Sequence, residues 1–156
     1  MSDIELVQAN PQRVYGVRRH GSYQIIPNMI MELFQVLRQK GVDVSGPPIY
    51  LCHESSMADV EAAMKTGFAD IEVAWPIALD VDPEGDIKTY VLPGGEMAKI
   101  IHRGPYEQTS QTYKVLFAWI AAHGKRIVDP IRESYLNDPR TVKPEDIITE
   151  IYAPIA

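Results

Sequence analysis

With 156 residues, of which 46% are hydrophobic and 23% charged, the chain is long enough for one well-buried core and too short for two ordinary domains. Its formal net charge of −6 argues against direct nucleic-acid binding, because neutralising phosphates requires clustered Lys and Arg. No apolar run approaches the roughly 20 residues that span a bilayer, and no signal-peptide pattern opens the chain, so we expect a cytoplasmic protein. Cys52 is the only cysteine, so we expect no internal disulfide.

The first half predicts a strand, a helix and two further strands. Residues 13–20 alternate imperfectly and indicate a strand. Apolar residues at helical spacing over 26–37 predict a helix, and Gly41 supplies its C-terminal stop. Residues 49–52 indicate a short strand and 68–79 a longer one.

The second half predicts the same order of elements. Residues 80–86 are acidic and rich in turn formers, which indicates a junction, and 87–92 alternate like one strand of a hairpin. The remaining elements are a strand at 97–103, a helical apolar face over 113–120, and strands at 131–136 and 147–155.

The two halves are related by an internal repeat. A shift of 83 positions places Gly21, Tyr23, Leu33, Phe34, Gly41 and Pro47 on Gly104, Tyr106, Leu116, Phe117, Gly124 and Pro130. A shift of 78 places Glu72, Pro76, Ile77 and Ala78 on Glu150, Pro154, Ile155 and Ala156. We therefore expect one domain over residues 1–156 with repeats at about 13–79 and 87–156. The predicted fold class is α+β: a strand-helix-strand-strand module duplicated with pseudo-two-fold symmetry, with helices packed on one side of an antiparallel sheet.

Motifs in the second half carry a family resemblance. They are His102-Arg-Gly-Pro-Tyr-Glu107, then Leu116, Trp119 and Gly124, then Ile131-Arg-Glu-Ser-Tyr-Leu-Asn-Asp-Pro139, and finally Thr149-Glu-Ile-Tyr-Ala-Pro-Ile155. In this order they strongly resemble the GyrI-like small-molecule-binding family, which includes the effector-binding domains of AraC-type and BmrR-like regulators. The resemblance implies a ligand groove between the two copies.

Glu133 is the candidate anchor of the ligand site. In multidrug-binding members of the family, a buried glutamate among aromatic rings receives cationic apolar ligands, and Glu133 matches that residue. Strand alternation places Glu133 and Tyr135 on one face. A buried carboxylate either stays protonated or waits for a cation. The residues alone leave open that Glu133 is a surface residue or pairs with a nearby arginine.

Several aromatic residues are candidates for the ligand-binding wall, with core packing as the alternative for each. Tyr50 matches Glu133 in the repeat alignment, so it is expected to face the same groove from the other copy. The further candidates are Trp75, Tyr106, Tyr113 and Trp119. Glu72 and Glu150, which match in the repeat, are expected to be salt-bridging or sheet-edge residues.

Other chemistries fit the sequence poorly. The four histidines lack the spacing of a zinc site, and no glycine-rich phosphate loop is present. We therefore expect neither a metal nor a cofactor, a buried and inert Cys52, and a polar loop at His53-Glu54.

Three functions follow from the resemblance. The first is a stand-alone module that captures apolar or cationic aromatic compounds. The second is a hydrolase of cyclopropane-bearing toxins that would use Glu133 as an acid–base group. The third is a gyrase-inhibitor-like or transcription-regulatory protein that acts through a protein partner. Whether the chain is an enzyme stays open on the sequence.

Overall fold

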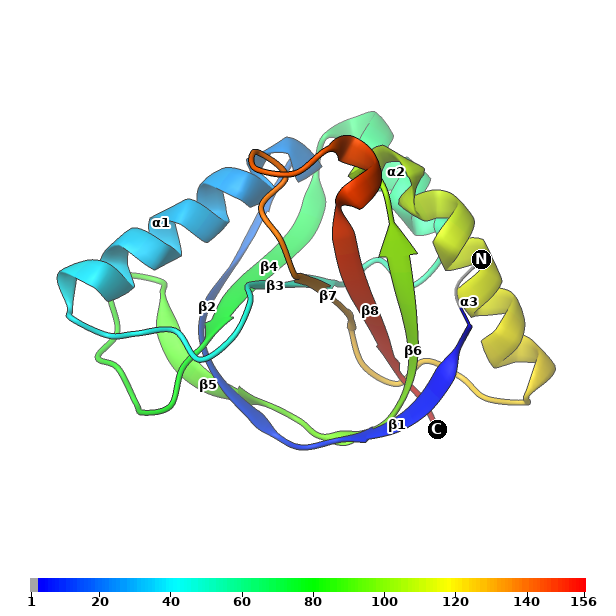
Figure 1. Cartoon of the computed structure of the whole chain (residues 1–156), viewed down its shortest axis with the longest axis horizontal. Helices are drawn as coiled ribbons and strands as arrows, with labels where there is room; N and C mark the ends of the chain where they lie inside the picture. Colours follow the sequence, from blue (N-terminus) through cyan, green and yellow to red (C-terminus); the bar gives the residue numbers. More distant parts are fainter. Residues whose placement is uncertain (1–2) are drawn as a thin grey trace. The chain divides into compact units, whose positions relative to one another are not determined.

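The computed structural model describes residues 3–156 and divides the chain into two compact units. Unit 1 combines residues 3–10 with 94–156, and unit 2 comprises residues 11–93 (Figure 1). Each unit is built on a four-stranded antiparallel sheet.

Unit 2 holds most of the first half of the chain. Its elements in chain order are β2 (Gln12–Gly21), η1 (Tyr23–Ile25), α1 (Ile26–Gln39), β3 (Ile49–Cys52), α2 (Met57–Thr66), β4 (Ala69–Pro76) and β5 (Lys88–Leu92). The strand order is β3-β4-β2-β5, and every pair is antiparallel. Helix α1 buries Met29, Leu33 and Leu37, and the Trp75 indole Nε1 on β4 donates a hydrogen bond of 2.9 Å to the Ile30 carbonyl oxygen. This contact fixes α1 on one face of the sheet.

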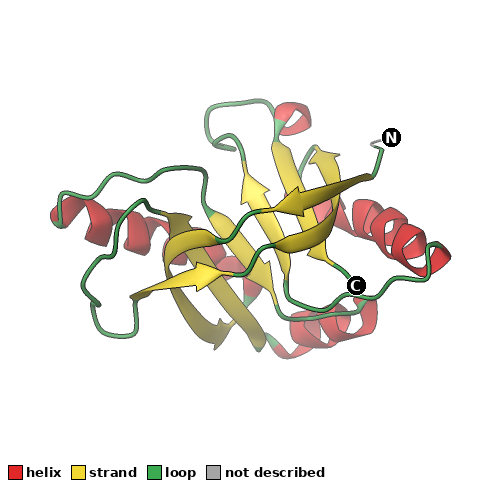
Figure 2. Cartoon of the chain, turned by 90° about the horizontal axis from the view of Figure 1, so that it is seen from below, coloured by secondary structure: helices red, strands yellow, loops and turns green. Residues whose placement is uncertain are grey.

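Unit 1 repeats the arrangement with one α-helix fewer in its described part. Figure 2 draws the helices of the chain in red and its strands in yellow. Its elements are β1 (Glu5–Ala9), β6 (Gly95–Arg103), η2 (Tyr106–Gln108), α3 (Thr109–Ala122), β7 (Ile131–Tyr135), η3 (Pro144–Asp146) and β8 (Ile148–Pro154). The strand order is β1-β6-β8-β7. Helix α3 buries Leu116 and Ile120.

The α+β class, the antiparallel strands and the duplicated module are confirmed. Adding 83 to the bounds of β1, η1 and α1 gives the bounds of β5, η2 and α3. The strand registers agree as well: Tyr50 pairs with Val73 on β4, and Glu133 pairs with Ile151 on β8. Tyr50 and Glu133 therefore occupy equivalent positions in the two sheets, as the repeat alignment predicted.

The edge strands are exchanged between the two copies. Strand β1 begins the first copy but pairs with β6, whereas β5 begins the second copy but pairs with β2, from Gln12↔Leu92 to Gly16↔Lys88. The strand predicted at residues 87–92 is present as β5, but it is not one strand of a hairpin, because its partner β2 is distant in sequence. The physical reason is burial, since Leu92 is only 4% exposed and packs into the hydrophobic cluster of unit 2.

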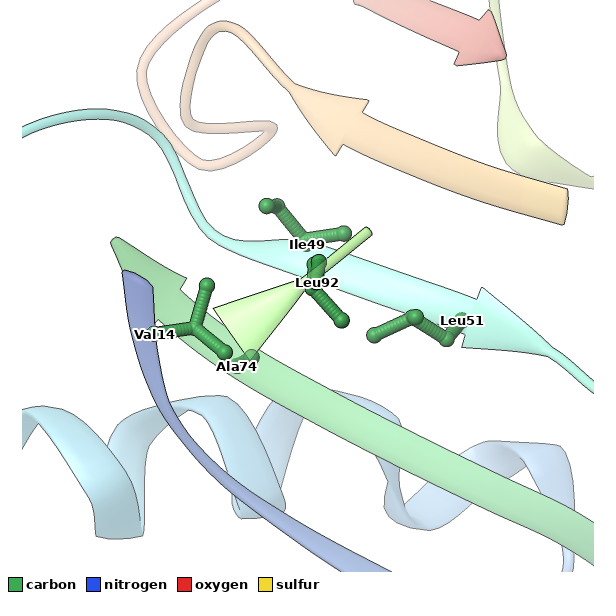
Figure 3. Packing of buried hydrophobic residues seen from close by; sticks show 5 residues of the cluster. All are labelled: Val14, Ile49, Leu51, Ala74 and Leu92. Carbon is green, nitrogen blue, oxygen red and sulfur yellow. The ribbon is translucent and has the colours of Figure 1, made fainter. Parts of the chain in front are cut away.

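That cluster lies on the face of the unit 2 sheet away from α1. It contains Val14, Ile49, Leu51, Ala74 and Leu92, with Tyr90 packed against it (Figure 3). Ala74 and Trp75 are neighbours on β4, so their side chains leave the sheet on opposite faces. Because Trp75 contacts α1, the cluster and Tyr90 occupy the face away from α1.

The two long helices end in the same way. Gly124 follows α3 with a φ of +65°, and the Lys125 N–H donates a hydrogen bond of 3.0 Å to the Ile120 carbonyl oxygen. Gly41 ends α1 with a φ of +71°. This left-handed C-terminal conformation favours glycine. A Cβ added at Gly124 would meet no atom within 4 Å, so any cost of substitution there is conformational.

Substituting Gly124 with valine is expected to lower the free energy of unfolding by about 1–2 kcal/mol, because a side chain strains the left-handed conformation. Gln111→Ala, on the exposed surface of the same helix, is the control and should change it by less than about 0.5 kcal/mol. Urea denaturation of both variants makes the comparison. Equal effects would show that Gly124 has no special backbone role.

Candidate functional site

Glu133 lies in the middle of β7, on the face of the unit 1 sheet that α3 covers. It is only 8% exposed. Its Oε1 accepts a hydrogen bond of 3.0 Å from the Tyr135 hydroxyl, and its Oε2 accepts a short hydrogen bond from the Tyr113 hydroxyl. Tyr135 reaches the same carboxylate because residues two apart on a strand share a face, and Tyr113 reaches it from the first half of α3. Both carboxylate oxygens are thus held by phenols.

Further rings surround these phenols within unit 1. The ring of Tyr106, on η2, stands edge-on to the Tyr135 ring, with centroids 5.3 Å apart and an interplanar angle of 62°. The Tyr113 ring lies tilted against Phe117, with centroids 5.8 Å apart. The carboxylate is therefore set among aromatic faces and edges, which is a favourable environment for an organic cation.

Burial raises the pKa of the Glu133 carboxyl group, although the hydrogen bonds from Tyr113 and Tyr135 and the nearby His102 partly oppose the effect. Within residues 3–156 no lysine or arginine forms a salt bridge with this carboxylate. Burial also raises the pKa of the Tyr106 hydroxyl, and the Glu133 charge adds to that shift. The site therefore favours either a protonated glutamate or a carboxylate with an external cation.

The raised pKa of Glu133 predicts a specific pH dependence of stability. The folded state keeps this proton at pH values where the unfolded chain has lost it, so the stabilisation is complete below the unfolded pKa and is lost as pH rises through the folded pKa. Relative to Glu133→Gln, the wild-type protein should lose stability with rising pH, with a slope of at most about 1.4 kcal/mol per pH unit. Denaturant midpoints from pH 4 to 8 measure this. Glu107→Gln, at an exposed position, is the control and should give no such difference from the wild type. Stability curves of wild type and Glu133→Gln that run parallel over this pH range would refute the assignment.

A second polar layer lies beside the glutamate. His102, on β6, is 4% exposed; its Nδ1 lies 2.7 Å from Thr112 Oγ1 and its Nε2 lies 2.9 Å from the Pro105 carbonyl oxygen. Because a carbonyl oxygen only accepts, Nε2 carries the proton. Thr149, which pairs with both His102 and Tyr135 across the strands, is fully buried and its hydroxyl has no hydrogen-bond partner among the described residues. Sequence reasoning missed this layer, because strand register creates it.

The structure brings Tyr106, Tyr113 and Tyr135 together around Glu133 and places the other candidates elsewhere in their units. Trp119 stacks on His123, with centroids 3.9 Å apart, near the C-terminal end of α3. Trp75 belongs to unit 2, where it lies tilted against Phe34 with centroids 5.1 Å apart.

Tyr50 also belongs to unit 2 and is 4% exposed on β3. Its position in the strand register is that of Glu133, so the two copies carry a phenol and a carboxylate at the same place. Tyr50 is therefore the residue of unit 2 that corresponds to the candidate anchor Glu133.

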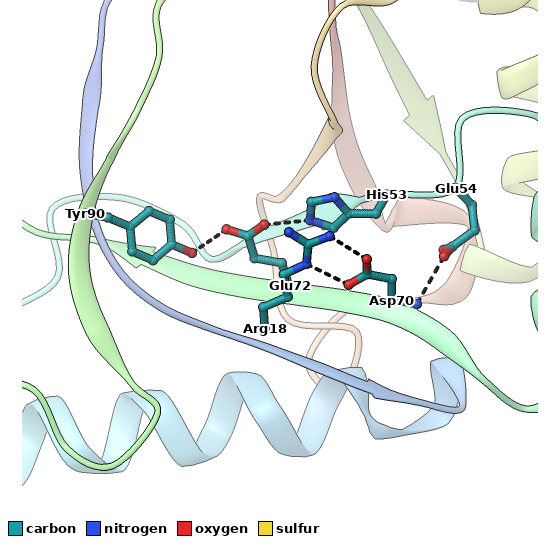
Figure 4. Close-up of polar contacts among 6 residues, drawn as sticks. All are labelled: Arg18, His53, Glu54, Asp70, Glu72 and Tyr90. Atoms are coloured by element: carbon teal, nitrogen blue, oxygen red, sulfur yellow. Dashed lines mark hydrogen bonds and ion pairs between the residues drawn. The ribbon is translucent and has the colours of Figure 1, made fainter.

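Glu72 and Glu150 form ion pairs on interior strands, so the sheet-edge alternative is wrong. Glu150 Oε2 lies 3.1 Å from Lys99 Nζ. Glu72 Oε1 lies 2.7 Å from His53 Nε2, and Glu72 Oε2 accepts a hydrogen bond of 2.5 Å from the Tyr90 hydroxyl (Figure 4). The strands that carry them, β4 and β8, each have a partner on both sides within their unit.

Residues 3–156 carry neither a candidate membrane-spanning helix nor a candidate metal cluster. No helix there is both long and apolar enough to cross a membrane. Nowhere in that range do three or more His, Cys, Asp or Glu side chains gather so that they could hold a metal ion.

The fold is thus a duplicated α+β module with a buried carboxylate among tyrosines in unit 1. The model of the GyrI-like small molecule binding domain matches residues 2–156. The chain belongs to this GyrI-like family. No curated protein matches the sequence.

Solved structures share the fold at low sequence identity. The EcmrR C-terminal domain has a TM-score of 0.88 at 21% identity, and the match covers 100% of this chain and 98% of that domain. In the EcmrR–DNA complex the match covers 99% of this chain but only 57% of EcmrR, with a TM-score of 0.86 and 21% identity. This chain therefore spans less than two thirds of EcmrR.

Two more distant structures have the same fold. A hydrolase from Listeria innocua has a TM-score of 0.68 at 16% identity, over 99% of this chain and 92% of that one. SAV2435 bound to tetraphenylphosphonium has a TM-score of 0.58 at 15% identity, over 99% of this chain and 94% of that one. At such identities these likenesses establish the fold alone.

Proposed function

We propose that the protein binds small lipophilic cations through Glu133. The observation that carries this proposal is the environment of the Glu133 carboxylate. The residue is 8% exposed, each carboxylate oxygen accepts a hydrogen bond from a tyrosine hydroxyl, and no salt bridge forms within residues 3–156. Ionising such a group without a partner is costly, and a bound cation supplies the missing charge. The Tyr113 and Tyr135 hydroxyls orient the carboxylate, because each donates a hydrogen bond to one of its oxygens.

The surrounding rings favour a cation whose charge is spread over apolar groups. Tyr106, Tyr113 and Tyr135 present aromatic surface next to the carboxylate, and cation–π attraction adds roughly 0.5–2 kcal/mol per ring. A strongly hydrated metal ion would gain little from these rings. We therefore assign the ligand class as organic cations with aromatic or aliphatic substituents, and tetraphenylphosphonium, named with SAV2435, is a suitable probe.

A thermal-shift titration tests the proposal. Tetraphenylphosphonium should raise the melting temperature, since a ligand that binds only the folded state stabilises it by RT ln(1 + [L]/Kd), or about 2.7 kcal/mol at 100 times Kd. Triphenylphosphine oxide, a neutral compound with similar aryl groups, is the control. A larger shift with the cation supports the proposal, whereas equal shifts with both compounds would contradict it.

Hydrolysis at the same glutamate is a second candidate, and one observation favours it. Because burial raises the pKa of Glu133, its carboxyl group can hold a proton that a strained electrophile such as a cyclopropane could accept. Water would then add to the opened ring. Incubation with a cyclopropane electrophile in ¹⁸O-labelled water should give a product with one heavy oxygen, as detected by mass spectrometry. If the folded protein leaves all of the electrophile intact, this function is excluded.

A further inference from the structure

Unit 2 contains a pocket that the function proposed for Glu133 does not use. Its volume is about 330 Å³, and it is bounded by α2, the loop after β3 and the start of β4. The lining residues are His53, Glu54, Asp59, Ala62, Ala63, Thr66, Phe68 and Asp70. Helix α2 has no helical counterpart at the equivalent place in the second copy, where the described chain has only a short 3-10 turn, η3. The pocket thus arises from a segment specific to the first copy.

His53 is held at this pocket in one orientation. Its Nε2 lies 2.7 Å from Glu72 Oε1, and the His53 and Glu72 side chains are 14% and 13% exposed. Glu72 is itself fixed by the Tyr90 hydroxyl on its other oxygen (Figure 4). The His53 Nδ1 atom takes part in no hydrogen bond among the described residues and is not a fully buried atom, and His53 is one of the residues that line the pocket.

The hydrogen bond to Glu72 selects the tautomer of the neutral His53 ring. Burial alone would raise the pKa of Glu72, but the hydrogen bonds from His53 and Tyr90 outweigh it and hold the pKa below its ordinary value. Tyr90 keeps its proton, because burial and Glu72 raise the pKa of its hydroxyl. An ionised Glu72 accepts a hydrogen bond from Nε2–H, so in the neutral ring the lone pair lies on Nδ1.

The neighbouring acidic groups are mostly engaged in other contacts. Asp70 forms two hydrogen bonds with the Arg18 guanidinium, at 2.8 and 2.5 Å. Glu54 accepts hydrogen bonds from the Tyr23 hydroxyl at 2.8 Å and from the Asp70 backbone N–H at 3.0 Å. The carboxylate of Asp59 completes the set of charged groups in the pocket wall. With these acids in place, His53 is the basic group that faces the cavity.

The second copy builds the equivalent position without an imidazole. The residue equivalent to Glu72 is Glu150, which pairs with Lys99 and accepts a hydrogen bond of 3.0 Å from the Tyr152 hydroxyl. Leu136 stands 83 positions after His53 and is 43% exposed. The imidazole beside the glutamate is therefore specific to unit 2.

We propose that His53 is a catalytic general base in a second small-molecule site, positioned by Glu72, and that the site hydrolyses small esters without negative charge. Phe68, 65% exposed, and the alanines of α2 offer apolar contact to such an ester, while the wall carboxylates repel anions. A water oxygen bonds to the ester carbonyl carbon as its proton passes to His53 Nδ1. The bond from that carbon to the alcohol oxygen then breaks, and the proton passes from Nδ1 to the departing alkoxide. Glu72 stays ionised and stabilises the imidazolium in between.

The test uses p-nitrophenyl acetate as the substrate. His53→Gln should lower kcat/KM by about 100-fold, the usual contribution of a general base. His123→Gln, the same substitution at an exposed histidine of unit 1, should leave the rate unchanged. The anionic ester p-nitrophenyl hemisuccinate should react more slowly than the acetate. Equal values of kcat/KM for the wild type and His53→Gln would overturn the proposal.

Glu72→Gln tests the positioning role through the separate effects on kcat and KM. The substitution removes the charged acceptor that lies 2.7 Å from His53 Nε2, so kcat should fall by about 10-fold or more while KM stays within about twofold. The acidic groups that line the pocket, Glu54, Asp59 and Asp70, remain in place. An unchanged kcat in folded Glu72→Gln protein would count against the proposal.

Chemical labelling keeps the proposal testable if His53→Gln does not fold. Diethyl pyrocarbonate acylates unprotonated imidazole nitrogens, so wild-type His53 should be labelled through Nδ1. His102, which is buried with both nitrogens in hydrogen bonds, should stay unmodified. Mass spectrometry that finds His53 as unreactive as His102 would refute an open, basic Nδ1.

Discussion

Replacing Glu133 with glutamine is expected to weaken binding of tetraphenylphosphonium by roughly 2–5 kcal/mol. The substitution removes the charge at nearly constant volume and leaves the positive charge of a desolvated ligand uncompensated. Folding should survive, because the buried carboxylate forms no salt bridge within residues 3–156 and glutamine can still accept a hydrogen bond from Tyr113 or Tyr135. Isothermal titration calorimetry of the folded variant measures the loss.

Two controls make this result specific. Glu150→Gln removes a carboxylate that is already paired with Lys99 in the same unit, and it should leave cation affinity within about twofold of the wild type. Triphenylphosphine oxide should bind Glu133→Gln and wild type alike. Unchanged cation affinity in a folded Glu133→Gln protein would move the assignment to another carboxylate, with Glu72 the first to examine.

Substituting Gly16 with alanine is expected to lower the free energy of unfolding by about 3 kcal/mol. A Cβ at this position would lie 2.3 Å from the Tyr90 hydroxyl oxygen and 2.8 Å from the Val73 carbonyl oxygen. Gly16 stands on β2 between Ala74 and Lys88, so strand pairing on both sides prevents the backbone from moving away. Overpacking of a rigid site typically costs about 1–3 kcal/mol, and displacement of Tyr90 also breaks its hydrogen bond to Glu72.

The internal repeat provides a matched control for this substitution. Lys99 stands 83 positions further along, and its partner Tyr152 is the residue equivalent to Ala74. Lys99→Ala removes atoms and adds none, so it causes no overpacking; it loses one salt bridge and should cost less than Gly16→Ala. Urea denaturation compares the two variants. Equal, small losses would show that Tyr90 moves aside freely and that the close approach at Gly16 has no structural role.

Local patterns predicted the strands that pack against helices, but the strands exchanged between copies depend on distant partners. The predicted strand at residues 49–52 agrees with β3, and the helix expected over 26–37 is α1 with bounds two residues longer at its C-terminus. Strand β1 was missed because it is short and its Leu6 is 51% exposed, so it shows no buried face. Pairing with β6 defines it, and no local pattern reveals that pairing.

Helix α2 was missed for a different reason. It buries only Ala63 and so lacks an apolar stripe at helical spacing. The ends of the helix did carry a signal, since the Ser56 side chain caps the N-terminus through the Asp59 N–H and Gly67 ends the helix with a φ of +66°. Capping residues on both sides of residues 57–66 would have predicted it.

The two candidate sites differ in how far the sequence could predict them. Glu133 and Tyr135 share a strand, so alternation placed them together, and the repeat placed Tyr50 at the equivalent position. The contact between Glu72 and Tyr90 depends on β5, which pairs with β2 across more than 70 residues of sequence. Only the exchange of edge strands creates that neighbourhood, so no local pattern indicated the His53 site.

The most direct test of a cation-binding Glu133 is a pH titration of its side-chain carboxyl group, monitored by ¹³C NMR. The carboxyl signal is assigned by comparison with the spectrum of Glu133→Gln. In the free protein the titration midpoint should lie above the ordinary value for glutamate, because burial raises this pKa. Saturation with tetraphenylphosphonium should lower the midpoint, since an adjacent positive charge favours the carboxylate. A midpoint that is the same with and without the bound cation would contradict the account.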